Sequence, residues 1–186
     1  MNKILRKRQL SENVNEYVIQ AEDVAKHARP GQFIILRVDG EGERVPFTIA
    51  DIDTKLGTIT ILVQTIGMTT YKLSLLNEGD YIHDFVGPLG NPTELSEYKN
   101  IVLVGGGIGS AVIYPQAKYR HKNGLQCDVI IGARNKGLLV YEEEFRQNAD
   151  NLYIVTDDGS YCEKGFVTTK LEALIKDGKN YDCVFA

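Results

Sequence analysis

Several features that would assign the protein to a class at once are missing from the sequence. It has only three cysteines, and none has the C-x-x-C spacing of zinc or iron–sulfur ligands. No apolar run approaches the roughly 20 residues that span a membrane, and no apolar stretch follows the basic N-terminus as in a signal peptide. We therefore expect a cytoplasmic protein with reduced thiols, no metal ligands in these residues and no membrane partner.

An excess of positive charge is also missing. The 186 residues carry a formal net charge of −4. The one dense basic run, Lys3, Arg6, Lys7 and Arg8, falls in a strand-like segment. Because nucleic-acid-binding domains usually carry a basic face, no nucleic-acid partner is expected.

The two halves of the chain have different hydrophobic patterns. Up to about residue 90, short alternating runs rich in β-branched and aromatic residues are separated by glycine and proline turns, which predicts an antiparallel β-barrel or sandwich. These runs are 5–10, 16–24, 32–38, 45–50, 58–64 and 81–86, with one helical candidate at 69–76. From residue 100, buried strand-like runs alternate with helical stretches, which predicts an α/β domain with a parallel sheet. The runs are 101–104, 128–133, 152–156 and 182–186, and the helical stretches are 112–121, 138–148 and 168–177.

A polar, turn-rich connection at 87–100 separates the halves, so we expect domains at 1–96 and 97–186. The run 182–186 reaches the last residue without a turn. Since domains seldom end inside a central strand, we expect the second domain to be incomplete at its C-terminus. A short edge strand is the alternative.

A glycine-rich turn follows the first strand of the second half and precedes a helix. It consists of Gly105, Gly106, Gly107, Ile108 and Gly109. Glycines let the backbone approach a pyrophosphate, whose charge a helix N-terminus favours. Ser110 stands where the usual dinucleotide fingerprint has its third glycine, and no acidic residue ends the next strand. The alternative is a turn that only packs helix against strand. Pro115 suggests a regular helix that begins near residue 112 or is kinked.

Three further segments are candidates for binding a nucleotide. The strand-like run Arg44, Val45, Pro46, Phe47 and Thr48 offers Arg44, with a fork suited to a phosphate, and Thr48, with a hydroxyl suited to a ring nitrogen. The alternative, which this segment alone favours, is an ordinary edge strand with an exposed arginine. The sequence Gly67, Met68, Thr69 and Thr70 precedes the first helical candidate, where its N–H groups would take up a phosphate unless a threonine simply caps the helix. The sequence Asp157, Asp158 and Gly159 follows the third parallel strand, where carboxylates would meet ribose hydroxyls unless they only form an Asx turn.

The order of these segments along the chain resembles the ferredoxin–NADP reductase superfamily. The resemblance covers the whole chain and is carried by RVPFTIAD, GPLGNP, VGGGIG, GARNK and TDDGSYCEKGFVTT. Within the superfamily, the chain is similar to the small electron-transfer subunit of NADH-dependent ferredoxin–NADP oxidoreductase and to the electron-transfer subunit of dihydroorotate dehydrogenase. Three positions depart from the pattern: Cys162 stands where such proteins commonly carry glycine, and Ser110 and Val112 fall in a stretch often written Ala-Pro.

The resemblance implies a role for each candidate segment. Arg44 would meet the FAD pyrophosphate, Thr48 would lie near the reactive flavin N5 as the catalytic contact, and Gly67, Thr69 and Thr70 would form the second flavin motif. The turn Gly105–Gly109 would border NAD(P)H, with Asp157, Asp158 and Gly159 near its ribose and Arg134 near the adenosine end. Arg134 would suit the 2′-phosphate of NADP(H), whereas Asp157 or Asp158 would suit the free ribose hydroxyls of NAD(H). We favour NAD(H).

The function implied is that of a flavoprotein electron-transfer subunit. A hydride would pass from NAD(P)H to FAD, and electrons would continue to an iron–sulfur centre, ferredoxin or a larger partner subunit. Related chains continue into a [2Fe–2S] segment that these residues lack. The alternatives are a dihydroorotate dehydrogenase subunit and a nucleotide-binding module without turnover.

Overall fold

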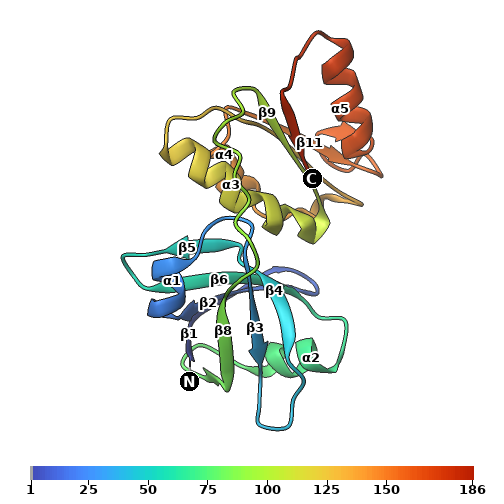
Figure 1. The fold of residues 1–186 in the computed structure, drawn as a ribbon. Coiled ribbons are helices and arrows are strands. Elements are labelled where there is room, and N and C mark those ends of the chain that lie inside the picture. Colours follow the sequence, from blue (N-terminus) through green and yellow to red (C-terminus); the bar gives the residue numbers. More distant parts are fainter. Residues whose placement is uncertain (1) are drawn as a thin grey trace. The chain divides into compact units, whose positions relative to one another are not determined.

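The structure is a computed structural model that describes residues 2–186. The chain forms two compact units, one up to Thr93 and the other over Glu94–Ala186 (Figure 1). The boundary expected from the sequence, after residue 96, lies a few residues further along the same polar connection. Each unit is described by itself.

The first unit is built from two antiparallel sheets. One has the strand order β5-β6-β2-β1-β7, with β1 at Asn2–Ser11, β2 at Val14–Gln20, β5 at Asp51–Asp53, β6 at Thr58–Gln64 and β7 at Tyr81–Ile82. The other has the order β4-β3-β8, with β3 at Phe33–Arg37, β4 at Val45–Thr48 and β8 at Asp84–Leu89. The antiparallel architecture predicted from the alternating runs is confirmed.

The period-two pattern decides which residues of β3 face the core. Ile34 and Leu36 are fully buried in the hydrophobic cluster of this unit, whereas Phe33, Ile35 and Arg37 are only half-buried. Because successive strand side chains point to opposite faces, Arg37 lies on the face away from the core. This placement matters for the site below.

Two helices complete the first unit, α1 at Glu22–His27 and α2 at Met68–Leu75. The extended run expected over 16–24 is wrong in its last part, where α1 begins. Val24 and Ala25 bury against the core, and the first turn is acidic while the last is basic, which suits the helix dipole. So short a helix depends on tertiary packing, which a strand-like hydrophobic pattern does not reveal.

The second unit is a five-stranded parallel sheet of order β12-β11-β10-β9-β13. Its strands are β9 at Ile101–Gly106, β10 at Asp128–Ala133, β11 at Asn151–Thr156, β12 at Glu163–Lys164 and β13 at Cys183–Phe185. The helices are α3 at Ser110–Lys122, α4 at Glu142–Arg146 and α5 at Val167–Lys176, and Figure 1 shows α5 on the face of the sheet opposite α3 and α4. All six residues of β10 are buried, as expected for a strand covered on both faces.

Two helix predictions in this unit need correction. Helix α3 begins at Ser110 instead of near residue 112, directly after a 3₁₀ turn at Gly107–Gly109, so Pro115 lies inside it. The helix expected over 138–148 is shorter: a 3₁₀ turn at Lys136–Leu138 comes first, and α4 covers only Glu142–Arg146. Tyr141, with φ of 64°, interrupts the helical path between them. No helix among residues 2–186 is long and apolar enough to cross a membrane.

Candidate functional site

The strand β4 presents two chemically different faces. It pairs with β3 so that Val45 lies opposite Leu36 and Thr48 opposite Phe33. Phe47 packs against the hydrophobic core, whereas Pro46 is exposed and lies on the other face. By alternation, Pro46 and Thr48 share the outward face, and the exposed Arg44 directly precedes the strand. The Thr48 hydroxyl makes no hydrogen bond within residues 2–186, so it is open to a ligand atom.

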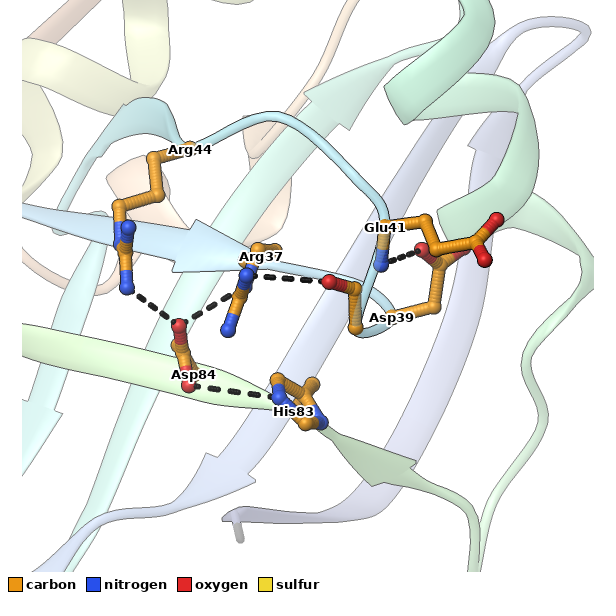
Figure 2. A network of polar contacts seen from close by, with 7 residues as sticks. Arg37, Asp39, Glu41, Arg44, His83 and Asp84 are labelled. Carbon is orange, nitrogen blue, oxygen red and sulfur yellow. Dashed lines mark hydrogen bonds and ion pairs between the residues drawn. The ribbon is translucent and has the colours of Figure 1, made fainter.

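Arg44 is held by a carboxylate on β8 (Figure 2). An η nitrogen of Arg44 lies 2.9 Å from Asp84 Oδ2, and Nε of Arg37 lies 2.8 Å from the same oxygen. Arg37 also donates to the Gly40 carbonyl at 3.1 Å, and His83 Nε2 lies 3.8 Å from Asp84 Oδ1. Partial burial works to raise the pKa of the Asp84 carboxyl, but Arg37 first, then Arg44 and His83, outweigh it and keep that pKa below its usual range.

The start of helix α2 has unused N–H groups. The Thr70 hydroxyl accepts hydrogen bonds from the Ile66 and Gly67 amides, both at 3.0 Å, and the first intrahelical bond runs from Tyr71 N–H to the Gly67 carbonyl. No side chain caps the helix, so the amides of Met68, Thr69 and Thr70 have no partner among the described residues. The alternative expected from the sequence was that a threonine caps the helix. The Thr70 hydroxyl does bind backbone amides, but these belong to Ile66 and Gly67, which precede the helix.

A pocket of about 180 Å³ adjoins this helix start. It is lined by Val38, Glu41, Gly42, Glu43, Met68, Thr69 and Lys72. The loop that follows β3 and leads to Arg44 therefore forms one wall, and the first turns of α2 form the other. These segments are separate in sequence, and the structure brings them together.

In the second unit, the sheet topology marks a ligand-binding edge. The chain runs from β9 outward through β10 and β11, and β13 then pairs with the other side of β9. Ligands of open α/β sheets bind at the carboxyl ends of the strands where the order reverses. The turn Gly105–Gly109 lies at this point, because it begins at the end of β9.

The four glycines of this turn serve two purposes. A Cβ on Gly105 would lie 2.9 Å from Cα of Ser110, so Gly105 lets strand and helix approach each other. Gly106, Gly107 and Gly109 have no atom within 4 Å of where a Cβ would be, and Gly107 has a φ of +54°. The packing interpretation therefore fits Gly105, whereas the other three, together with Ile108 in the 3₁₀ turn, leave open backbone for a ligand.

The loops after β10 and β11 are linked to each other. The Asp157 amide donates to the Ala133 carbonyl at 3.1 Å and the Asp158 amide to the Arg134 carbonyl at 3.2 Å. These bonds bring Arg134, Asp157 and Asp158 to one edge. Arg134 is exposed and forms no ion pair among residues 2–186.

The two aspartates of this edge differ in their bonding. The Asp158 carboxylate accepts from the Ser160 amide at 2.8 Å, and the hydrogen bonds of Ser160 lower the Asp158 pKa. This is the Asx-type turn given as the alternative. Asp157 makes no such side-chain bond in the described part of the chain and is the freer carboxylate. Gly159 has φ of +78°, and Cys162 has φ of 53°, the left-handed region that glycine favours.

Sequence reasoning missed Arg37, Asp84 and His83. Arg37 and Asp84 are direct partners across β3 and β8, which follow each other in the sheet but not in the sequence. Only the register of that pair reveals the contact, and no local motif carries it. No group of three or more metal-ligating side chains is found among residues 2–186.

Comparison with known proteins assigns the first unit. The family described as Oxidoreductase FAD-binding domain matches residues 2–93. A dihydroorotate dehydrogenase B (NAD⁺) electron transfer subunit homolog of Thermotoga maritima is 44% identical over 96% of this chain and 63% of its own length. The electron transfer subunit of that enzyme from Fusobacterium nucleatum subsp. nucleatum is 32% identical over 94% of this chain and 71% of its own length.

A solved structure extends the similarity to both units. A chain of NADH-dependent reduced ferredoxin–NADP oxidoreductase, described in relation to flavin-based electron bifurcation, is 41% identical, with a TM-score of 0.89 over 98% of this chain and 65% of that one. This chain therefore spans just under two thirds of that structure and of the Thermotoga relative. It belongs to the FAD-binding oxidoreductases of ferredoxin reductase-like fold, the family that includes the dihydroorotate dehydrogenase B electron transfer subunits.

Proposed function

We propose that this chain is the flavin- and nucleotide-binding part of an electron-transfer subunit that oxidises NADH. The observation that supports it most is the presence, within one unit, of open helix amides at 68–70 and of the exposed Arg44 directly before β4. Two sources of positive potential serve the one anionic group of FAD, its pyrophosphate. Bound FAD would accept a hydride and return its electrons one at a time.

The residues of the first unit suit FAD in shape as well as charge. Gly67 has no atom within 4 Å of where a Cβ would be, so a phosphate can come close to the helix start. Arg44 would bind the pyrophosphate together with the amides of Met68, Thr69 and Thr70. Thr48, with Pro46 on the same face between it and Arg44, would donate its hydroxyl to the isoalloxazine ring. Val45 and Phe47 would support this strand from the core side.

The second unit would bind the nicotinamide nucleotide at the carboxyl edge of its sheet. The backbone of Gly106, Gly107 and Gly109 would admit the diphosphate. Asp157 would accept hydrogen bonds from ribose hydroxyls, with Asp158 and Gly159 shaping its turn and Arg134 near the adenosine end. A free carboxylate at the ribose favours NAD(H) over NADP(H). Hydride transfer itself requires no protein acid or base, because the hydrogen nucleus and both electrons move together.

The partner would be a larger subunit or protein that takes electrons, such as a flavoprotein with iron–sulfur centres or a ferredoxin. The relatives' description as electron transfer subunits supports a partner of this kind. The names of those relatives also support a second candidate, a subunit that serves dihydroorotate dehydrogenase. Electron transfer to each purified acceptor would distinguish the two candidates.

The first experiment is the visible spectrum of the purified chain, with identification of any flavin released on denaturation. The proposal expects FAD in about equimolar amount, bleached by NADH in the absence of oxygen. A protein that neither carries nor takes up FAD would contradict it. FAD binding without bleaching, or without reduction of an artificial acceptor, would instead support a nucleotide-binding module without turnover.

A further inference from the structure

We propose that Asp84 is a positioning residue that sets the Arg44 guanidinium for the FAD pyrophosphate, with Arg37 as its compensating charge. The inference rests on the proposed FAD site and adds to it a residue that no binding motif contains. It starts from three charged side chains that meet at one sheet: Arg37 on β3, Asp84 on β8, and Arg44 in the residue before β4.

The sheet register explains why these side chains meet. Arg37 on β3 lies directly opposite Asp84 on β8, and Val45 on β4 lies opposite Leu36. Arg44 therefore adjoins Arg37 from the other side of β3. Two guanidinium groups that share one carboxylate oxygen are close enough to repel each other. Asp84 Oδ2, at 2.8 Å from Arg37 and 2.9 Å from Arg44, offsets that repulsion (Figure 2).

The two arginines are not equivalent. The Arg37 side chain is 22% exposed and is also bound to the Gly40 carbonyl, so it is fixed within the loop that follows β3. The Arg44 side chain is 60% exposed and gives one η nitrogen to Asp84. Since a guanidinium has five N–H donors, most of its fork stays available to an anion. One negative and two positive charges leave the cluster with a net positive charge.

A positioning role and a purely electrostatic role for Asp84 predict different effects on FAD binding. A carboxylate beside a pyrophosphate site repels the ligand, so removing its charge should strengthen FAD binding if Asp84 acts only through the field. If Asp84 instead holds Arg44 in place, removing its charge frees Arg44 to move away from Arg37, and FAD binding weakens. The two roles predict opposite signs of the same measurement.

The experiment is a titration of flavin-free protein with FAD, followed by quenching of flavin fluorescence, for the unaltered chain and for Asp84→Asn, Arg44→Ala and the double variant. We expect Asp84→Asn to raise the Kd for FAD roughly tenfold, the scale of a lost charge-assisted contact. Arg44→Ala should raise it by roughly ten- to a hundredfold. In the Arg44→Ala background, Asp84→Asn should cause no further loss of affinity, because Asp84 acts through Arg44.

The matched control is Glu12→Gln, which removes the same charge from an exposed carboxylate of the same unit outside the candidate site. It should bind FAD as tightly as the unaltered chain. Circular dichroism checks that each variant is folded. Asp84→Glu keeps the charge but displaces the carboxylate, so it should weaken FAD binding less than Asp84→Asn does. It takes the place of Asp84→Asn in the titration if that variant is poorly folded.

The outcomes separate the inference from the function beneath it. Equal or tighter FAD binding by Asp84→Asn, or the same loss in both backgrounds, overturns the positioning role. An Arg44→Ala variant with unchanged affinity overturns the assignment of Arg44 to the pyrophosphate, and the inference with it. If the unaltered chain takes up no FAD, the proposed function itself fails.

Discussion

At the scale of single residues, charged groups in this chain serve packing as well as binding. Arg120 is fully buried, and within the described part of the chain its guanidinium donates to backbone carbonyls alone: Leu95 at 2.6 Å, Tyr98 at 2.9 Å and Gln126 at 2.8 Å, with a longer contact to Lys99. Desolvation lowers the Arg120 pKa from its ordinary value. One side chain thus fixes the start of the second unit to the end of α3.

Replacing Arg120 with Met should destabilise the second unit strongly. Met fills a similar volume but leaves several buried carbonyls without donors, each of which costs about 1–3 kcal/mol. We expect a loss of about 3–5 kcal/mol in the free energy of unfolding, measured by urea denaturation. The control is Arg146→Met, since Arg146 forms a half-exposed ion pair with Glu142 and should cost about 1 kcal/mol or less. Equal losses for both would contradict the buried-donor argument.

The glycine turn offers a matched pair of substitutions that separates packing from binding. A Cβ on Gly105 would meet the backbone of Ser110, so Gly105→Ala should lower stability by about 1–3 kcal/mol. A Cβ on Gly106 meets nothing, and its φ of −112° suits alanine, so Gly106→Ala should keep its thermal midpoint.

Gly106→Ala should instead weaken NADH binding, since the added methyl occupies the space proposed for the diphosphate. Isothermal calorimetry would show a Kd raised by roughly tenfold, or about 1.4 kcal/mol. Unchanged NADH affinity in a folded Gly106→Ala protein would remove this turn from the nucleotide site.

At the scale of elements, a polar network joins three segments at the amino end of the parallel sheet. Asp128 on β10 accepts from Asn151 on β11 at 2.7 Å, and from Lys179 at 3.0 Å and Tyr181 at 2.7 Å in the segment before β13. Burial works to raise the Asp128 pKa, but these hydrogen bonds and the Lys179 charge outweigh it and lower the pKa below its ordinary value of 3.8. The network ties β13 to its place beside β9.

This lowered pKa predicts the sign of the pH dependence. A carboxyl whose folded-state pKa is depressed adds stability above its unfolded-state pKa, and loses it as the pH falls through the folded-state value. The contribution should therefore be complete above about pH 4 and decline below it. Asp128→Asn should be less stable than the unaltered chain at pH 7, and the difference should shrink below pH 4 in denaturant titrations. Asp177→Asn, at an exposed carboxyl, is the control. A difference that stays constant with pH would contradict the linkage.

Elements also show how far sequence patterns reach. The longer strands and the helices α2, α3 and α5 were predicted from local hydrophobic patterns. The short strands β5 and β12 were missed, and the run 81–86 is divided between β7 and β8. Helix α1 was missed, since its first three residues fall in the run expected to be a strand and so short a helix depends on tertiary packing. The helix predicted over 138–148 is too long, because Tyr141 adopts a left-handed conformation that cannot be predicted from a tyrosine at this position.

The residues of the candidate site also differ in whether local sequence predicts them. The glycine turn, the helix start and the aspartates could be found from local sequence, because each is a short segment after a strand. Arg37 and Asp84 could not, since their contact joins positions 47 residues apart (84 − 37) through the register of β3 and β8. The sequence also left Asp157 and Asp158 equivalent, whereas the fold engages one in a turn and leaves the other free. Their cofactor roles stay predictions.

At the scale of the whole molecule, the two compact units have separate hydrophobic cores. One cluster includes Tyr17, Ile34 and Leu73, and the other includes Val102, Ile130 and Leu174. Each unit also carries its own candidate site, formed by residues of that unit alone. A ligand that binds one folded unit stabilises that unit by mass action, by about 2.7 kcal/mol at a concentration of a hundred times its Kd.

Calorimetry of the flavin-free chain should therefore resolve two unfolding transitions, and each ligand should move one of them. FAD should raise the midpoint of the first unit by about 5 °C or more at a hundredfold excess over Kd, whereas NADH should raise the midpoint of the second. Arg120→Met assigns the transitions, because it lowers only that of the second unit. If Gly106→Ala abolishes the NADH shift while the FAD shift remains, the two sites are energetically separable. If FAD instead raises the transition that Arg120→Met lowers, FAD does not bind where the β4 and α2 residues are proposed to hold it.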